Sequence, residues 1–132
     1  MMTKTIQPEQ LAKSGSEHGH AAALMCWAAQ NIKQYPELKW LTHIGHGGKL
    51  DKITAGRMKA EGLKRGVPDY LLLVRRGNYS ALWIELKKLE GKLSHEQVLW
   101  LNQARECGHF ATVCYCWEEA REMIIWYLNH GK

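Results

Sequence analysis

Residues 66–87, GVPDYLLLVRRGNYSALWIELK, constrain the fold more than any other stretch of the chain. The apolar runs YLLLV and ALWIEL flank a Gly-Asn pair, which is typical of a buried β-hairpin. However, Asp69 precedes the first run, and Glu85 and Lys87 stand at the end of the second. Charged side chains in an apolar strand are costly unless they pair or bind a metal ion. The hairpin therefore predicts a sheet with a charged site at one end.

The turn of this hairpin decides whether the two acids meet. Side chains alternate faces along a strand, so Trp83, Glu85 and Lys87 share one face. Asp69 lies opposite Glu85 only if the loop is odd in length or one strand contains a bulge. A strict two-residue Gly-Asn turn would instead pair Asp69 with Leu86 and send it to the other face. A site built from both acids therefore requires an odd loop or a bulge.

The rest of the chain predicts an α/β fold, in which a small mixed sheet carries helices on its faces. We expect residues 1–13 to form a loose arm and residues 14–132 to form one domain. Capping boxes at Ser14–Glu17 and Ser94–Gln97 mark two helix starts. The expected order is a helix that ends before Pro36, a strand over 38–44, a helix over 51–62, the hairpin, a helix from Ser94 to Gly108, a strand over 109–117 and a closing helix.

The helix between the hairpin and the strand over 109–117 predicts parallel pairing of the two through a right-handed crossover. Helical spacing also predicts which helix side chains are buried. They are Leu24, Trp27, Ala28 and Ile32 in the first helix, Val98, Leu101 and Ala104 in the helix after the hairpin, and Ala120, Ile124, Tyr127 and Leu128 in the last.

The basic charge of the chain is confined to one segment. Residues 43–92 hold eleven Lys or Arg against five Asp or Glu, a balance of +6, whereas the whole chain carries +5. The remaining residues therefore net −1. A polyanion partner is one interpretation, and a solvated lysine-rich surface is the other.

Asp69, Glu85 and Lys87 admit two interpretations. Two carboxylates that converge near a basic side chain can form a Mg²⁺ site, because this ion prefers oxygen ligands. Alternatively, Glu85 and Lys87 form an ordinary pair at a sheet edge, and Asp69 ends a turn after Pro68. Pro68-Asp69, placed sixteen positions before Glu85-Leu86-Lys87, resembles the PD-(D/E)xK nuclease signature.

Longer stretches resemble the VRR-NUC family of this nuclease superfamily over residues 16–128. They are SEHGHAAALMCWA at 16–28, HIGHGGK at 43–49, AGRMKAEGLKRGVPD at 55–69 and IELKKLEGKLSHEQVLWLNQARECGH at 84–109. The resemblance implies a restriction-endonuclease-like α/β core. It also implies that Asp69 and Glu85 bind Mg²⁺ or Mn²⁺ together with the backbone carbonyl of Leu86, and that Lys87 is the catalytic lysine.

The resemblance adds Glu17 and Gln97 to the catalytic set. Glu17 matches an acid of the first helix, which would reach the metal directly or through water, and Gln97 matches the glutamine of an LSxEQ stretch. Each has a local alternative, because both stand at the third position of an expected capping box, where Glu and Gln are favoured.

A nuclease would bring its basic segment onto DNA. The candidate DNA-contact residues are Lys49, Lys52, Arg57, Lys59, Lys64, Arg65, Arg75, Arg76, Lys88 and Lys92. One departure from the family lies at residues 45–48, where His46 and then Lys49 stand in place of an expected Asn and Arg, which leaves the contacts there open.

Other chemistries have little support in the sequence. His18 and His20 are two apart on an expected helix and point away from each other, and no Cys pair completes a zinc set. The cysteines, Cys26, Cys107, Cys114 and Cys116, are expected as reduced thiols. No nucleotide-binding or Ser-nucleophile motif is present, and no apolar run reaches membrane-spanning length.

We therefore expect a Mg²⁺- or Mn²⁺-dependent DNA endonuclease in the cytoplasm of a bacterium or a phage-infected host. Standalone members of the resembled family look like homodimeric resolvases of branched DNA, often from bacteriophages or prophages, so four-way junctions are the implied substrate. A nuclease for flaps or single strands and a non-catalytic nucleic-acid binder on the same fold are the alternatives. Trp100 and Trp126 are candidates for the subunit interface, or they complete the monomer core.

Overall fold

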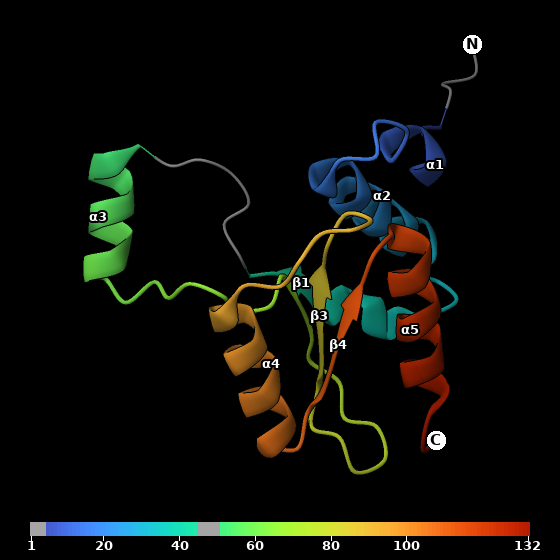
Figure 1. Ribbon diagram of the computed structural model, residues 1–132. Helices are drawn as coiled ribbons and strands as arrows, with labels where there is room; N and C mark the ends of the chain where they lie inside the picture. The colour runs from blue at the N-terminus through green and yellow to red at the C-terminus, as the bar shows by residue number, and fades with distance from the viewer. Residues whose placement is uncertain (1–4, 45–50) are drawn as a thin grey trace.

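The structure, a computed structural model, describes residues 5–44 and 51–132. Its elements follow the predicted order, with two short helices added, Pro8–Leu11 and Pro36–Trp40 (Figure 1). They are α1 (Pro8–Leu11), α2 (Glu17–Gln30), the 3₁₀ helix η1 (Pro36–Trp40), β1 (Leu41–His43), α3 (Lys52–Ala60), β2 (Tyr70–Leu72), β3 (Leu82–Leu86), α4 (His95–Glu106), β4 (Phe110–Cys114) and α5 (Trp117–Asn129). No described helix is long and apolar enough to cross a membrane.

The four strands of the described chain form one mixed sheet in the order β1-β2-β3-β4. β2 pairs antiparallel with β1 and β3, and β3 pairs parallel with β4. The parallel pairing predicted through the helix between them is confirmed. The small mixed α/β sheet flanked by helices is likewise confirmed.

The main core lies between the sheet and two helices, α2 and α5, while α4 lies on the other face (Figure 1). Alternation along β3 sends Leu82, Ile84 and Leu86 into this core. The four residues predicted to be buried in the closing helix are all buried. Val98 and Ile32 are exposed instead, because α4 packs through Leu101 and α2 ends at Gln30.

The N-terminal part differs from prediction in three places. Residues 8–11 form α1, which packs against α2, although a loose arm was expected. α2 is capped by Ser16, whose hydroxyl accepts the Gly19 N–H at 2.9 Å, so the predicted capping box at Ser14 and Glu17 is wrong. Residues 36–40 are a 3₁₀ helix because Pro36 suits the first helical position, and the predicted strand over 38–44 shortens to β1.

The hairpin contains a two-residue turn and a bulge together. Arg76 pairs with Tyr79 across Gly77-Asn78, while Leu72 pairs with Leu82. Residues 73–75 thus face only residues 80–81, and the extra residue shifts the pairing by one position. Within the bulge the Val74 N–H turns back to the Leu72 carbonyl at 3.0 Å. The register condition set by the sequence is therefore met by a bulge.

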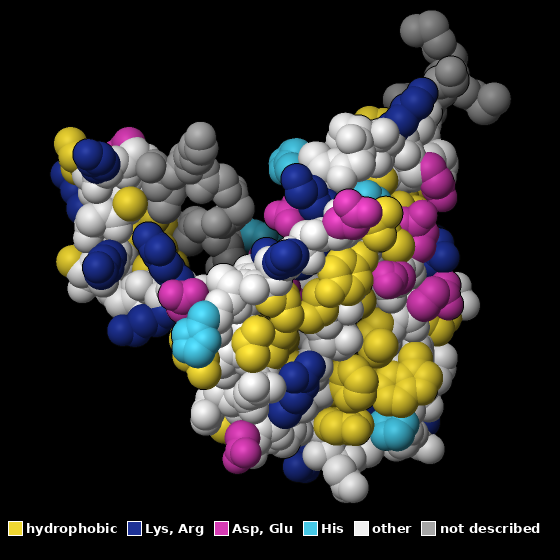
Figure 2. All heavy atoms as spheres, viewed as in Figure 1, with side chains coloured by type: hydrophobic (Ala, Val, Ile, Leu, Met, Phe, Trp, Pro, Cys, Tyr) yellow, Lys and Arg dark blue, Asp and Glu magenta, His cyan; other side chains and the backbone are white. Residues whose placement is uncertain are grey.

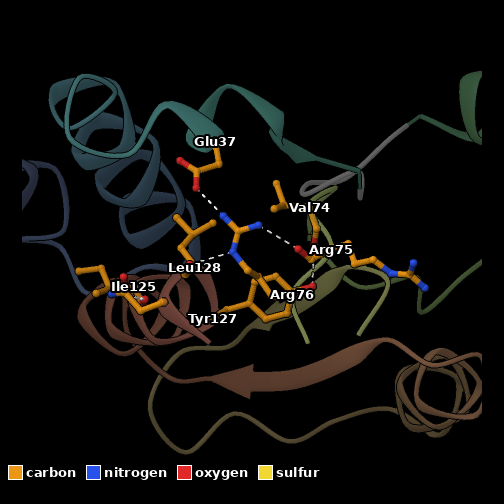
Figure 3. A network of polar contacts seen from close by, with 8 residues as sticks. Glu37, Val74, Arg75, Arg76, Ile125, Tyr127 and Leu128 are labelled. Atoms are coloured by element: carbon orange, nitrogen blue, oxygen red, sulfur yellow. Dashed lines mark hydrogen bonds and ion pairs between the residues drawn. The ribbon is translucent and has the colours of Figure 1, made fainter. Parts of the chain in front are cut away.

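A polar network between the hairpin and two helices holds this bulge (Figure 3). Tyr127 of α5 donates its hydroxyl to the Val74 carbonyl at 2.6 Å. The half-buried Arg76 guanidinium pairs with Glu37 of η1 and donates to the Leu128 carbonyl at 2.8 Å. Both contacts act on the residues that set the register of β2 against β3.

Candidate active site

The two acids of the hairpin meet at the end of the sheet where β2 begins and β3 ends. Tyr70 pairs with Ile84, so the bulged register places Asp69 opposite Glu85. A cavity of about 450 Å³ opens beside Asp69. It is lined by Glu17, His18, Ala21, His43, Asp69, Tyr70 and Leu86. Residues from α2, β1, β2 and β3 thus converge on one hollow.

The two carboxylates are held by different partners. Asp69 lies just before the start of β2, and its Oδ2 accepts the Leu86 backbone N–H at 2.8 Å. Glu85 is only 3% exposed, and its Oε1 accepts the Gln97 amide at 2.9 Å. Glu85 Oε2 is buried with no hydrogen-bond partner among the described residues. Each carboxylate is oriented by one bond, and one buried oxygen has no protein partner.

Burial and mutual repulsion oppose the ionisation of this pair. Burial raises the pKa of Glu85 to about 8, the neighbouring Asp69 adds to the rise, and the Lys87 charge opposes it. Burial also raises the pKa of Asp69, and the hydrogen bond from the Leu86 N–H opposes this rise only in part. A positive charge placed between the acids would remove this penalty.

Gln97 both caps α4 and contacts Glu85. Its Oε1 accepts the Ser94 N–H at 2.8 Å and its backbone N–H bonds the Ser94 hydroxyl, so the predicted capping box of α4 is confirmed. Its amide nitrogen is left to face Glu85. Because the cap fixes the amide orientation, α4 begins with a donor aimed at a site carboxylate.

Glu17 stands at the first position of α2, so the capping-box explanation of this residue does not hold. Its Oε1 accepts the Lys88 N–H at 3.3 Å, across 71 residues of sequence. The side chain is exposed and lines the cavity together with Asp69. Glu17 therefore ties the start of α2 to the segment just after β3.

Lys87 follows β3 directly. Its backbone N–H bonds the Cys114 carbonyl at 2.9 Å, which continues the parallel ladder and places the side chain on the Glu85 face. The side chain is half-buried and forms no ion pair within the described ranges. Its ammonium is thus available to a group bound between the acids.

The donor set fits a hard divalent cation. Carboxylate and carbonyl oxygens are the ligands that Mg²⁺ and Mn²⁺ prefer, and the buried, unpartnered Glu85 Oε2 beside Asp69 is the observation that a cation would explain. No group of three or more His, Cys, Asp or Glu suited to holding an ion occurs within residues 5–44 and 51–132. Two carboxylates would therefore leave several positions of the ion to the Leu86 carbonyl, to Glu17 or to water.

Most of the basic candidates lie on exposed surface. Lys52, Arg57 and Lys59 belong to α3, and the other exposed candidates are Lys64, Arg65, Arg75, Lys88 and Lys92. Arg76 is engaged in the bulge network instead, which leaves its guanidinium poorly placed for phosphate. Lys49 and His46 fall outside the described residues.

Two histidines of the cavity were not assigned to the site from the sequence. His43 reaches it because β1 pairs His43 with Tyr70, next to Asp69. His18 follows Glu17 and lines the same cavity, while His20 turns inward, where its Nδ1 accepts the Trp117 N–H at 3.1 Å. Had the strand over 38–44 been predicted to pair antiparallel with the hairpin, His43 would have been expected next to Asp69.

Comparison with known proteins identifies a nuclease-type domain. The VRR-NUC domain model matches residues 10–117. A solved structure described as a VRR_NUC domain protein has a TM-score of 0.72 and 22% sequence identity, and the match covers 98% of this chain and 94% of that one. That likeness shows the fold. No curated protein matches the sequence.

Proposed function

The chain belongs to the VRR-NUC domain family, and from this premise we propose that it is a divalent-metal-dependent DNA endonuclease. A nuclease domain implies DNA as the substrate, and VRR-NUC nucleases generally depend on divalent metal ions. The observation that supports catalysis in this chain is that Asp69 and Glu85 lie opposite each other in the sheet, with Glu85 two residues before Lys87. Glu85 Oε2 is buried without a hydrogen-bond partner among the described residues.

Asp69, Glu85 and the Leu86 carbonyl would hold Mg²⁺ or Mn²⁺, with Glu17 at the rim. When bound, the ion supplies neutralisation of phosphate charge and acidifies water. Gln97 fixes the rotamer of Glu85 through its 2.9 Å bond. Lys87 orients the attacking water or stabilises the negative charge that develops on the phosphoryl oxygens. The water oxygen bonds to phosphorus as the bond between phosphorus and the 3′ oxygen breaks. The water gives up a proton to solvent and the leaving 3′ oxygen takes one up, which leaves 5′-phosphate and 3′-hydroxyl ends.

We infer that the substrate is branched DNA, cut by a homodimer. Four-way junction resolution needs two symmetric incisions, and a twofold dimer supplies two identical sites. Cleavage of flaps or single strands by the same site is the nearer alternative. A non-catalytic binder is the more distant one, and the complete set of Asp69, Glu85 and Lys87 argues against it.

The proposed activity is tested with labelled junction, flap and linear duplex DNA in Mg²⁺ or EDTA. Asp69→Ala or Glu85→Ala should abolish Mg²⁺-dependent cleavage while the fold survives, because removing either buried acid also removes its desolvation cost. Lys87→Ala should lose turnover and keep most of its DNA affinity. Circular dichroism checks the fold of each variant. Near wild-type cleavage by Asp69→Ala would rule out this site.

A further inference from the structure

α3 stands apart from the sheet and from the other helices (Figure 1). None of its side chains is buried among the described residues, and Ile53 is 72% exposed. The helix has nine residues, whereas isolated helices shorter than about 12–15 residues are marginal in water. Its stability must therefore come from local contacts or from a partner.

Local contacts supply only part of what α3 needs. Asp51 caps the helix, accepting the Thr54 N–H and hydroxyl at 2.8 Å each. Arg57 and Lys59 lie in the last turn, where positive charge is favourable. Against this, Gly56 sits in the middle and disfavours the helix. Local contacts therefore leave α3 a marginal helix.

The charge of this segment indicates a polyanion. Residues 51–65 hold five cations, Lys52, Arg57, Lys59, Lys64 and Arg65, against the two acids Asp51 and Glu61, a balance of +3. All five cationic side chains are exposed, and none is in an ion pair within the part of the chain described (Figure 2). Protein interfaces are depleted in lysine at their centres, so a phosphate backbone fits α3 better than a second copy does.

The segment that carries α3 starts and ends at the candidate active site. Ile44 and Asp69 lie at its two ends, and the Ile44 N–H donates to the Asp69 carbonyl at 2.7 Å. The eight residues between α3 and Asp69 span at most about 28 Å, less than one turn of duplex DNA, about 34 Å. A duplex that runs toward α3 from a scissile phosphate at Asp69 would therefore come within reach of this helix.

The returning part of this segment is also fixed at one point. Gly66 has φ +90°, and a Cβ there would lie 2.5 Å from the backbone carbon of Glu96 and 2.8 Å from the Gln97 nitrogen. The chain thus packs against the first turn of α4, next to the glutamine that orients Glu85. α3 projects from a fixed base beside the catalytic groups.

We propose that α3 is a duplex-binding arm whose helix is stabilised by the DNA that it grips, so that the site favours phosphates flanked by double-stranded DNA. The location of the scissile phosphate rests on the proposed nuclease function. The binding itself does not require cleavage. DNA binding and folding of α3 are then one coupled equilibrium.

Substitution of Gly56 tests the coupling at constant charge. A Cβ at Gly56 meets nothing within 4 Å, so Gly56→Ala changes only helix propensity, and Gly56→Pro breaks the helix. With a labelled blunt 20-base-pair duplex in EDTA, Gly56→Ala should tighten binding by up to about fivefold. Gly56→Pro should weaken it by about tenfold. Amide exchange over residues 51–61 should slow when the duplex is added.

Two triple variants with the same change in charge provide the control. The first changes three cations of α3 to Glu (Lys52, Arg57 and Lys59), and the second changes three cations outside α3 to Glu (Lys13, Lys33 and Lys132). All six side chains are exposed, so the first variant should weaken duplex binding far more only if α3 itself contacts DNA. Equal affinities of Gly56→Ala, Gly56→Pro and wild type overturn the proposal. Loss of self-association in Gly56→Pro with unchanged DNA affinity also overturns it, because α3 then docks on a second copy. If wild type fails to cut DNA in Mg²⁺ while the Gly56 ranking holds, the nuclease function fails and the arm stands.

Discussion

At the residue scale, the candidate site depends on contacts between separate elements: Gln97 of α4 donates to Glu85, and Glu17 of α2 accepts a backbone N–H from the segment just after β3. Asp69 and Glu85 were recognisable from the sequence because charge in an apolar hairpin needs a reason. Gln97 was ambiguous because the same local pattern serves a helix cap and a site, and the structure shows it capping α4 while its amide donates to Glu85. Glu17 became interpretable only when the cap of α2 proved to be Ser16. Bonds between residues far apart in sequence decide such cases.

The buried acid pair predicts an unusual pH dependence of stability in EDTA. The pKa of Glu85 rises from 4.5 to about 8 on folding, so between these values the unfolded chain releases a proton that the folded chain retains. Stability should therefore fall as pH rises from about 4.5 to 8. Glu85→Gln should flatten this part of the Tm–pH curve and raise Tm at pH 8.

Two additions sharpen this measurement. Mg²⁺ should raise the wild-type Tm more at pH 8 than at pH 5, because the ionised carboxylates bind it. The exposed Glu118→Gln serves as the control and should follow wild type. Parallel Tm–pH curves for wild type and Glu85→Gln would contradict the assigned shift.

At the element scale, two registers of the hairpin were compatible with the sequence. The sequence did not show that a bulge would select the one that brings the two acids together. The sequence required an odd loop or a bulge, and a two-residue turn with a bulge is what forms. The bulge depends on Tyr127 and Glu37, which approach it only in the folded chain. α3 was predicted as a helix from its local pattern, but local pattern carries no information on where a helix without a buried face lies.

The bulge network predicts different effects for two adjacent arginines. Arg76→Ala should destabilise the fold by about 2 kcal/mol, because it removes hydrogen bonds from a charged group and leaves Glu37 unpaired. If the pairing of β2 with β3 also becomes less well defined, the cleavage rate should fall by more than the loss of folded protein accounts for. Arg75→Ala, at an exposed position, should leave Tm unchanged and lower DNA affinity.

Thermal melts and salt titrations separate the two variants. Log affinity falls with log salt by about 0.9 for each phosphate contact in duplex DNA, so Arg75→Ala should have a shallower slope and Arg76→Ala should keep the wild-type slope. If Arg76→Ala kept the wild-type Tm but gave a shallower plot of log affinity against log salt, the Arg76 guanidinium would contact DNA. Its assignment to the bulge network would then be wrong.

At the scale of the whole molecule, an apolar surface beside β4 is available for a second copy. Trp126 is 45% exposed and packs on Phe110, with ring centroids 5.2 Å apart. Trp100 of α4 is 38% exposed and lines a separate pocket with Pro68 and Trp83. Hydrophobic side chains gather on this side of the molecule (Figure 2). The alternative that both tryptophans complete the monomer core is therefore not favoured.

Sheet extension through β4 is a poor way to join two copies. β4 is an edge of the described sheet, but the Arg105 guanidinium donates to its Ala111 carbonyl at 2.9 and 3.1 Å. Glu118, Glu119 and Glu122 rim the groove beside Trp126, which discourages phosphate there. We expect side chains around Trp126 to form the twofold contact, with DNA bound elsewhere.

This surface predicts that the protein is a dimer that cuts junctions in pairs. One chain carries one Asp69–Glu85–Lys87 set, so two symmetric incisions within one binding event require two chains held at a fixed separation. Sedimentation at micromolar concentration should give about twice 15.2 kDa, and a cruciform plasmid should be linearised. Trp126→Lys should give monomers that make single nicks, whereas Trp40→Lys, at a site on η1 that is 54% exposed, should remain dimeric. A dimeric Trp126→Lys protein would move the interface elsewhere, and a monomeric wild type that cuts flaps faster than junctions would leave a nuclease that is not a resolvase.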